Sequence, residues 1–329
     1  MLIHLTRTIS RQDRQELLRR VALLLPGARA RSSAAGLTVT GFFPAKAADA
    51  VPLLENLPAV LNIELAVQEL CPLATNAAAR KSFSKPLDFS GGFIFIAGPC
   101  AVEGEASYLA SAMALKAAGA SALRAPLFKP RSSPYAFQGI GFAGLKIIAR
   151  AKKISGLPLV TETTDPRQIA RLAPVCDMLQ IGARNMRNYE LLKEAGRSGL
   201  PVLLKRAMRA TLKEWLLSAE YLLKHGTRDL ALCERGDSVF SADNTGLDFA
   251  IMRAAKKTTG LPVLADPSHS SRERTLAAAL ALKAAAAGAD GLLIEASVDP
   301  RGARVDGRQT LTVEKFSKIV GAILCKKTK

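Results

Sequence analysis

Seven cationic side chains of this sequence lie in or just after short apolar runs, where a folded chain could present them together. They are Arg124, Lys129, Arg131, Arg184, Lys205, Arg206 and Arg235. Guanidinium groups bind phosphate and carboxylate through paired hydrogen bonds, and an ammonium adds a compact point charge. Any one of them could be a solvated surface charge, but seven neighbouring cations would repel one another unless an anion lies among them. The set therefore predicts one or two small substrates with phosphate and carboxylate groups.

A second group of four residues has the donor types of a metal site: Cys100, His269, Glu295 and Asp306. A thiolate, an imidazole and two carboxylates suit one divalent transition metal of the Mn²⁺, Fe²⁺, Zn²⁺ or Co²⁺ class rather than Ca²⁺. Their spacing is not a compact ligand motif, and taken singly Cys100 could be a core thiol and His269 a structural histidine. The prediction therefore depends on a fold that brings the four positions together.

A regular alternation of strands and helices from residue 91 onward would position both groups. Eight apolar runs predict strands at residues 93–98, 122–127, 159–163, 178–182, 202–205, 230–234, 263–266 and 292–295. Helices are predicted between them at 105–118, 145–155, 188–198, 211–225, 245–259 and 272–287. All-apolar strands separated by helices indicate a parallel sheet buried on both faces. Eight such units predict a (β/α)₈ TIM barrel, with a doubly wound open sheet as the alternative.

In such a barrel, chemistry takes place at the carboxyl ends of the strands. The cations and the metal-donor set would then share one mouth. Cys100 follows the first strand, His269 the seventh, and Glu295 ends the eighth, and these strands are neighbours once the barrel closes. We therefore expect the metal beside an anion-binding cavity.

Residues 1–67 have a different pattern and predict a small ferredoxin-like α+β domain ahead of the barrel. Strands are expected at 2–6, 28–43 (or a hairpin there) and 61–66, with helices at 11–25 and 47–57. This β-α-β-α-β order suits a ferredoxin-like module. Residues 68–90 are interpreted as a linker, and residues 91–329 as the catalytic barrel.

The overall composition restricts the function less than these positions do. The 329 residues include 46 Lys and Arg against 28 Asp and Glu, a formal net charge of +18. Such a charge attracts any polyanion, yet aromatic residues are only 5% of the chain, so platforms for stacking nucleotide bases are scarce. Five scattered cysteines form no disulfide framework. Charge alone leaves nucleic acid, small phosphorylated substrates and simple solubility open. The placement of the cations at the strand ends favours small substrates, so we expect a cytoplasmic protein that binds neither nucleic acid nor membrane.

Seven motifs, in this order along the chain, resemble those of the 3-deoxy-D-arabino-heptulosonate 7-phosphate (DAHP) synthases. They are Gly98-Pro99-Cys100, Leu123-Arg124, Lys129-Pro130-Arg131-Ser132-Ser133-Pro134, Gln180-Ile181-Gly182-Ala183-Arg184-Asn185, Leu203-Leu204-Lys205-Arg206, Cys233-Glu234-Arg235-Gly236 and Asp266-Pro267-Ser268-His269-Ser270. The resemblance covers residues 92–324. It indicates the branch that has an N-terminal ferredoxin-like domain and a barrel shared with 3-deoxy-D-manno-octulosonate (KDO) 8-phosphate synthase.

The resemblance implies condensation of phosphoenolpyruvate with erythrose 4-phosphate and water to DAHP and phosphate, the first step of the shikimate pathway to aromatic amino acids. It assigns phosphoenolpyruvate to Arg124, Lys129, Arg184, Lys205 and Arg235. It assigns the phosphate of the aldose to Arg131 and Ser132, and the metal to Cys100, His269, Glu295 and Asp306. A homo-oligomer, dimer or tetramer, is expected, and residues 1–67 would be a regulatory domain.

Lys129 is the group expected to transfer protons, with Glu162 and Asp266 orienting water. Crowding by arginines would lower the pKa of Lys129 and suit it to acid–base work. Two alternatives remain at this point. One is a KDO 8-phosphate synthase acting on arabinose 5-phosphate, and the other is a non-catalytic, basic nucleic-acid-binding protein built on a barrel scaffold.

Overall fold

The computed structural model describes residues 1–33, 36–76, 87–89, 91–237, 246–327 of the chain. It divides into two compact units, Met1–Thr75 and Asn76–Lys329, each of which has its own core. Most of the predicted linker, at 77–86 and 90, lies outside the described residues. Among the described residues, no helix is both long and apolar enough to span a lipid bilayer.

The first unit is a four-stranded antiparallel sheet with two helices. Its elements are β1 (Leu2–Leu5), α1 (Arg11–Leu24), β2 (Arg29–Ser33), β3 (Gly36–Thr40), α2 (Pro44–Glu55) and β4 (Val60–Glu64). The strand order β2-β3-β1-β4 is that of a ferredoxin-like fold, as predicted. Ser10 begins α1 as an N-cap, since its hydroxyl accepts a hydrogen bond from the amide of Asp13 at 3.0 Å.

The unit extends beyond the sequence-based boundary at residue 67. Two short helices follow β4, α3 (Val67–Leu70) and α4 (Pro72–Thr75), and both belong to the first compact unit. Glu69 of α3 accepts a hydrogen bond from the amide of Ala66 at 2.8 Å, which caps the helix. The start of the segment interpreted as a linker is therefore helical. Pro72 does not prevent this, because it is the first residue of α4 and proline is compatible with a helix start.

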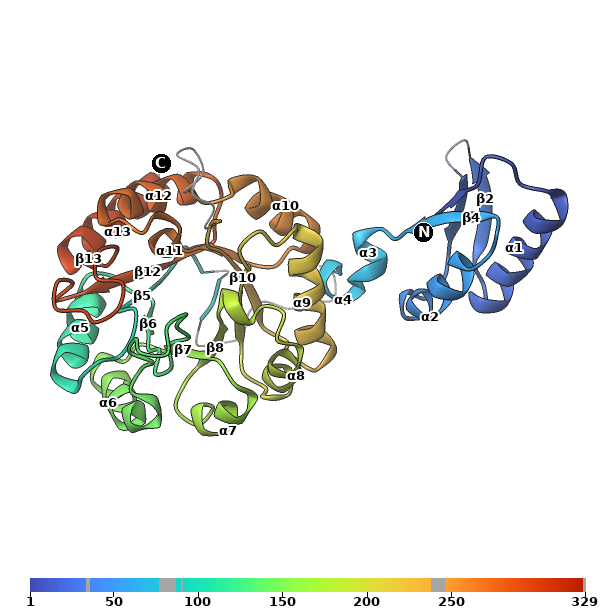
Figure 1. Cartoon of the computed structure of the whole chain (residues 1–329). Coiled ribbons are helices and arrows are strands. Elements are labelled where there is room, and N and C mark those ends of the chain that lie inside the picture. Colours follow the sequence, from blue (N-terminus) through green and yellow to red (C-terminus); the bar gives the residue numbers. More distant parts are fainter. Residues whose placement is uncertain (34–35, 77–86, 90, 238–245, 328–329) are drawn as a thin grey trace. The chain divides into compact units, whose positions relative to one another are not determined.

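The second unit is a closed barrel of eight parallel strands surrounded by helices (Figure 1). Its strands are β5 (Ile94–Gly98), β6 (Ala122–Arg124), β7 (Leu159–Thr163), β8 (Met178–Ile181), β9 (Val202–Lys205), β10 (Leu230–Glu234), β11 (Val263–Ala265) and β12 (Gly291–Ser297). Pairing of β11 with β12 and of β12 with β5 closes the ring. The predicted TIM barrel is confirmed, and the open-sheet alternative is wrong.

Helices and short 3₁₀ segments connect the strands. They are α5 (Glu105–Ala117), η2 (Gly141–Gly144), α6 (Leu145–Ser155), η3 (Pro166–Gln168), α7 (Ile169–Leu172), η4 (Ala183–Asn185), α8 (Tyr189–Arg197), α9 (Leu212–Lys224), α10 (Phe249–Thr259), α11 (Pro267–Ser271), α12 (Arg274–Ala286) and, after the short strand β13 (Leu311–Thr312), α13 (Val313–Lys327). The barrel interior is filled by buried side chains from every strand, among them Ile96, Val160, Leu203 and Leu293. The barrel is therefore a packed core, and chemistry is restricted to its ends.

Two helix-to-strand connections of the barrel, from α6 to β7 and from α10 to β11, repeat the same sequence pattern. Residues 151–162 read AKKISGLPLVTE and residues 255–266 read AKKTTGLPVLAD. In the first, Lys152 is paired with Asp177 at 2.8 Å, and in the second Lys256 is paired with Asp290 at 2.6 Å. Each repeat ends in a carboxylate, Glu162 within β7 and Asp266 directly after β11, so both acids lie at the same end of the barrel.

Candidate active site

A cavity of about 1000 Å³ lies at the carboxyl ends of the barrel strands. Nine of the residues predicted for the site line it: Lys129, Arg131, Ser132, Glu162, Arg184, Lys205, Arg235, His269 and Asp306. The other four, Arg124, Cys100, Glu295 and Asp266, are buried beside it rather than among its lining residues. The strand ends thus bring the cationic and metal-donor sets to one place.

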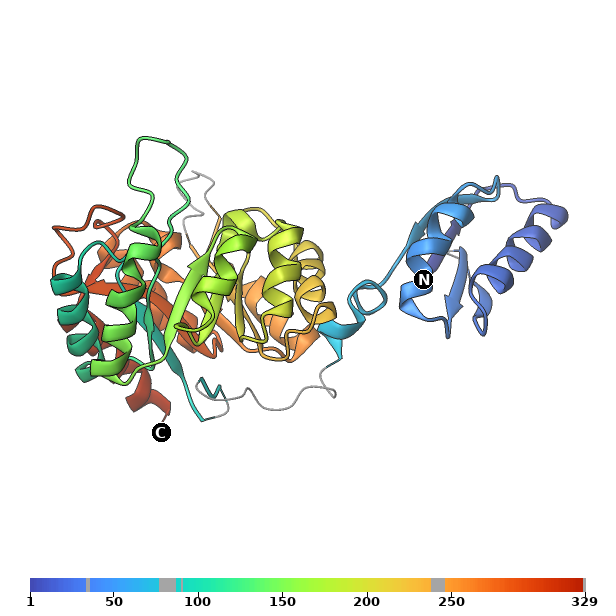
Figure 2. The ribbon, with the colours of Figure 1, turned by 90° about the horizontal axis from the view of Figure 1, so that it is seen from below.

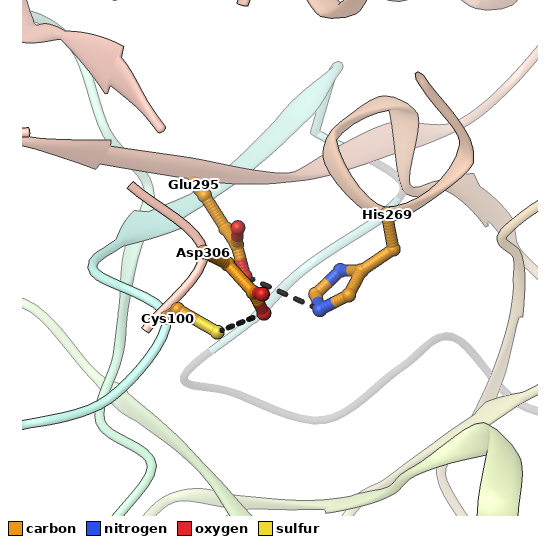
Figure 3. Close-up of side chains that lie close together, drawn as sticks. All are labelled: Cys100, His269, Glu295 and Asp306. Carbon is orange, nitrogen blue, oxygen red and sulfur yellow. Dashed lines mark hydrogen bonds and ion pairs between the residues drawn. The ribbon is translucent and has the colours of Figure 1, made fainter. Parts of the chain in front are cut away.

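The four metal-donor residues converge, as Figure 3 shows. One ligand atom from each lies within 4.8 Å of the others. The Cys100 thiol is 3.0 Å from a carboxylate oxygen of Asp306, and Nε2 of His269 is 3.2 Å from Oε1 of Glu295. A soft sulfur, one imidazole nitrogen and two carboxylates in a cluster of this size fit a divalent transition metal.

Asp266 fixes the orientation of the histidine. It caps α11, where its Oδ1 accepts the backbone amide of His269 at 3.0 Å. Its Oδ2 is 2.7 Å from Nδ1 of the same imidazole. Because a carboxylate only accepts hydrogen bonds, Nδ1 carries the proton, and the lone pair of Nε2 is left facing Glu295.

Glu295 is held by three polar neighbours although its side chain is fully buried. Its Oε1 accepts from Arg124 at 3.1 Å, its Oε2 from Gln309 at 2.7 Å, and its backbone amide donates to the hydroxyl of Ser268 at 2.9 Å. Burial alone would raise the pKa of this carboxyl, but His269, Arg124 and Lys129 lower it to about 2. Glu295 is therefore anionic at neutral pH and able to bind a cation.

Burial shifts the pKa values of two other donor groups, His269 and Cys100, in opposite directions. It lowers the pKa of His269, in spite of the neighbouring carboxylates of Asp266 and Glu295, so the imidazole is neutral at neutral pH. Burial, with the charge of Glu295, raises the pKa of the Cys100 thiol well above its ordinary value. Cys100 is thus the donor that must give up a proton when a cation arrives.

The pKa of Lys129 is raised, not lowered as expected. Burial and Arg124 do disfavour its ammonium, but Glu162 and Glu295, together with Cys100 when it is ionised, outweigh them. The cations can be counted along the chain, but the acids that the barrel places near Lys129 are distant from it in the sequence. Lys129 therefore carries its proton at neutral pH.

Arg206, one of the seven predicted cations, is not among the residues that line the cavity. Its guanidinium pairs with the buried carboxylate of Glu234, with Nη2 2.9 Å from Oε1, and donates to the carbonyl of Ala210 at 2.8 Å. The same Oε1 accepts the backbone amide of Gly236 at 2.7 Å. Arg206 therefore shapes the turn that carries Arg235 and is not available to a substrate.

The cavity also has three arginines and a glutamine that the strand-end argument missed: Arg272, Arg304, Arg308 and Gln309. Arg272 follows α11, and the others belong to the long segment after β12. These positions lie too far beyond the strands for the pattern of apolar runs to predict them. The only available signal was the repeated occurrence of arginine around Asp306.

Comparison with known proteins gives this geometry a context. Residues 90–327 match the DAHP synthetase I family. A phospho-2-dehydro-3-deoxyheptonate aldolase of Thermotoga maritima is 41% identical over 232 residues, which are 70% of this chain and 69% of that protein. A 2-dehydro-3-deoxyphosphooctonate aldolase of Desulfatibacillum aliphaticivorans is 33% identical over 252 residues, 70% of this chain and 90% of the relative.

Solved structures match both units. The crystal structure of a DAHP synthase from Thermotoga maritima aligns with a TM-score of 0.85 at 30% identity, covering 98% of this chain and 96% of that one. A truncated form of the 3-deoxy-D-arabino-heptulosonate 7-phosphate synthase from the same organism aligns with a TM-score of 0.70 at 34% identity, covering 77% and 95%.

The proton held by Cys100 predicts how metal affinity depends on pH. Because the thiol is protonated at neutral pH and His269 is already neutral, binding of Co²⁺ to metal-free protein should release about one proton. Affinity should then rise by up to about tenfold per pH unit across the neutral range. Calorimetric titration with Co²⁺ at several pH values measures this slope.

The Cys100→Ser variant is the matched control, since a serine hydroxyl stays protonated and the pH slope should flatten as affinity falls. A parent protein whose Co²⁺ affinity does not change with pH would contradict the assignment of Cys100 as a ligand.

Proposed function

The chain belongs to the DAHP synthetase I family, and we propose that it condenses phosphoenolpyruvate with erythrose 4-phosphate and water to DAHP and phosphate, with a divalent metal. One observation carries the proposal: a cavity lined by lysines and arginines lies against a cluster of Cys, His, Glu and Asp donors. Two phosphorylated substrates supply the anions for the cations.

Phosphoenolpyruvate is proposed to lie among the cations supplied by β8, β9 and β10. Lys205 and Arg235 line the cavity next to the metal-donor cluster, and the Arg235 guanidinium is held by the carbonyl of His269 at 3.2 Å. Arg184 lies in η4, directly after β8, and donates to the carbonyl of Pro130 at 3.2 Å. These three side chains could bind the phosphate and carboxylate from several sides.

Arg124 is a further cation proposed for the same site, and its guanidinium is buried beside the cavity. Its Nη2 is bonded to Glu295, while Nε and Nη1 are buried and have no hydrogen-bond partner among the described residues. Buried guanidinium nitrogens without partners cost free energy, and an anionic substrate would satisfy them. The phosphate of the aldose is assigned to Arg131 and Ser132, which line the cavity on the loop after β6.

The residues that would hold the metal are Cys100, His269, Glu295 and Asp306. When bound there, a divalent ion would act as a Lewis acid toward the aldehyde oxygen. Asp266 is assigned a positioning role, because its carboxylate is bonded both to the Lys205 ammonium and to His269 and does not line the cavity.

The protein's own side chains supply the proton transfers. Carbon 3 of phosphoenolpyruvate forms a bond to the aldehyde carbon, and the aldehyde oxygen takes a proton from the Lys129 ammonium. Water then adds to carbon 2, and Glu162 takes the proton that this water loses. The carbon–oxygen bond to phosphate breaks, phosphate leaves with the electron pair and takes the proton from Glu162, and the hydroxyl proton passes to the neutral amine of Lys129 as the ketone forms. Protonated Lys129 and cavity-lining Glu162 suit these roles.

The test is consumption of phosphoenolpyruvate by the metal-free protein after addition of Mn²⁺, Fe²⁺, Zn²⁺ or Co²⁺. We expect phosphate release with erythrose 4-phosphate, dependent on the metal and lost by at least about 100-fold in Lys129→Met, which keeps the length of the side chain without its charge. Turnover of arabinose 5-phosphate in place of erythrose 4-phosphate would contradict the proposed substrate. Full activity without metal would contradict the metal.

Gly182→Ala tests the role of Glu162 without changing it. Gly182 has a φ of −66°, which alanine adopts freely, but a Cβ there would lie 2.1 Å from Oε1 of Glu162 and push the carboxylate aside. We expect kcat to fall by about 10- to 100-fold, the range for a displaced general base, with the thermal midpoint nearly unchanged. Unchanged kcat would argue against Glu162 as the group that receives the proton.

The first unit is proposed to regulate and not to catalyse, because all the residues that line the cavity come from the second unit. Deletion of residues 1–75 should leave kcat within about threefold, since no proposed catalytic group is removed. It should also abolish inhibition by tyrosine or phenylalanine. If neither amino acid inhibits the full-length chain, this regulatory role is wrong.

A further inference from the structure

Asp306 differs from the other three metal-donor residues in how it is held. Cys100 and Glu295 are adjacent to or within strands, and His269 lies on α11, whereas Asp306 belongs to the loop between β12 and β13. Its φ is +53°, a left-handed conformation that costs free energy for a residue other than glycine. Such a conformation persists only when the surrounding structure holds it, so other contacts must fix this loop.

Glu103 provides the first of these contacts. It follows β5 on the same loop as Cys100, and its carboxylate lies against the backbone just ahead of Asp306. The amide of Arg304 is 2.9 Å from both carboxylate oxygens, and the amide of Val305 is 3.2 Å from Oε1. A carboxylate bonded to two consecutive amides restrains the direction of the chain that follows. Glu103 therefore joins the loops that carry Cys100 and Asp306.

Phe137 provides the second contact, from a third loop. The guanidinium carbon of Arg304 is 4.0 Å from the centre of the Phe137 ring, within the range of a cation–π interaction. The same ring packs against the buried cluster of Cys100, Ala101 and Val305. Phe137 lies in the loop between β6 and η2, which stands out from one end of the barrel in Figure 2.

We propose that Glu103 and Phe137 are positioning residues that hold the segment from Arg304 to Asp306 so that Asp306 meets Cys100. Glu103 restrains the backbone of this segment, and Phe137 packs against the cluster of Cys100, Ala101 and Val305 and holds the Arg304 guanidinium over its ring. The same arrangement ties the metal-donor loop to the loop that carries Arg131 and Ser132. This inference rests on the metal site of the proposed function.

The experiment is titration of metal-free, full-length protein with Co²⁺, followed through the thiolate-to-cobalt absorption. In Glu103→Ala, loss of the carboxylate should weaken Co²⁺ binding by about 10- to 100-fold, the usual effect of removing a group that orients a ligand. Glu103→Gln, which keeps one acceptor oxygen and the shape, should lie between this variant and the parent.

Variants of Phe137 distinguish the effect of the aromatic π face from the effect of side-chain volume. Phe137→Leu retains apolar contact with the cluster of Cys100, Ala101 and Val305 but loses the π face that binds Arg304. Co²⁺ binding should therefore weaken by about two- to fivefold. Phe137→Tyr keeps the aromatic ring and should bind Co²⁺ as the parent does.

The matched control for the Glu103 variants is Glu105→Gln. Glu105 lies two residues from Glu103, and its exposed carboxylate pairs at 2.8 Å with Arg150, so this substitution should leave Co²⁺ affinity unchanged.

Amide hydrogen exchange of the metal-free protein supplies a readout that does not involve metal. The amides of Arg304 and Val305 should exchange faster in Glu103→Gln, while the thermal unfolding followed through Trp215, the only tryptophan, stays close to that of the parent. Parent-like exchange at both amides would overturn the role of Glu103.

The two levels of the proposal fail differently. If the parent chain binds no Co²⁺, both the proposed metal and the positioning role are wrong. If the parent binds Co²⁺ and the Glu103 and Phe137 variants bind it equally well, the positioning role alone is wrong.

Discussion

The buried carboxylate of Asp266 connects the two halves of the site. One side chain caps α11, fixes the proton of His269 on Nδ1 and pairs with the Lys205 ammonium. Burial alone would raise the pKa of Asp266, but His269 and Lys205 hold it well below its ordinary value. The carboxylate therefore remains charged from neutral pH far into the acid range. Its charge allows a lysine to lie next to a set of metal-donor side chains without a net excess of positive charge.

The same balance of charge explains why the cations of the barrel divide into two kinds. Arg206 and Arg124 are matched to the buried acids Glu234 and Glu295, and they shape the strand ends. Arg131 and Arg184 line the cavity and face a space large enough for small phosphorylated molecules. The total charge of +18 is thus a poor indicator of the binding partner, because it does not distinguish cations that already have a buried acid from those that face the cavity.

Sequence patterns predicted the strand ends well because each strand begins as a short apolar run and polar residues follow. The runs ending near Gly98, Lys205 and Glu295 correspond to β5, β9 and β12 within one or two residues. Parallel strands in a barrel all point the same way, so residues far apart in the sequence could be assigned to one mouth. Positions in long loops could not be predicted in this way. Arg304 and Glu103 meet through contacts between loops, for which the sequence contains no periodic signal.

By itself, the sequence determined the two kinds of domain, the order of their elements and the types of donor and cation at the strand ends. These follow from local patterns of apolar residues and from side-chain chemistry. Only the tertiary structure decided the state of Lys129, whose raised pKa depends on acids brought in by β5, β7 and β12. It also decided that Arg206 is paired and that Asp306 reaches Cys100. Electrostatic free energies depend on distance and burial in three dimensions, and neither can be read from separation along the chain.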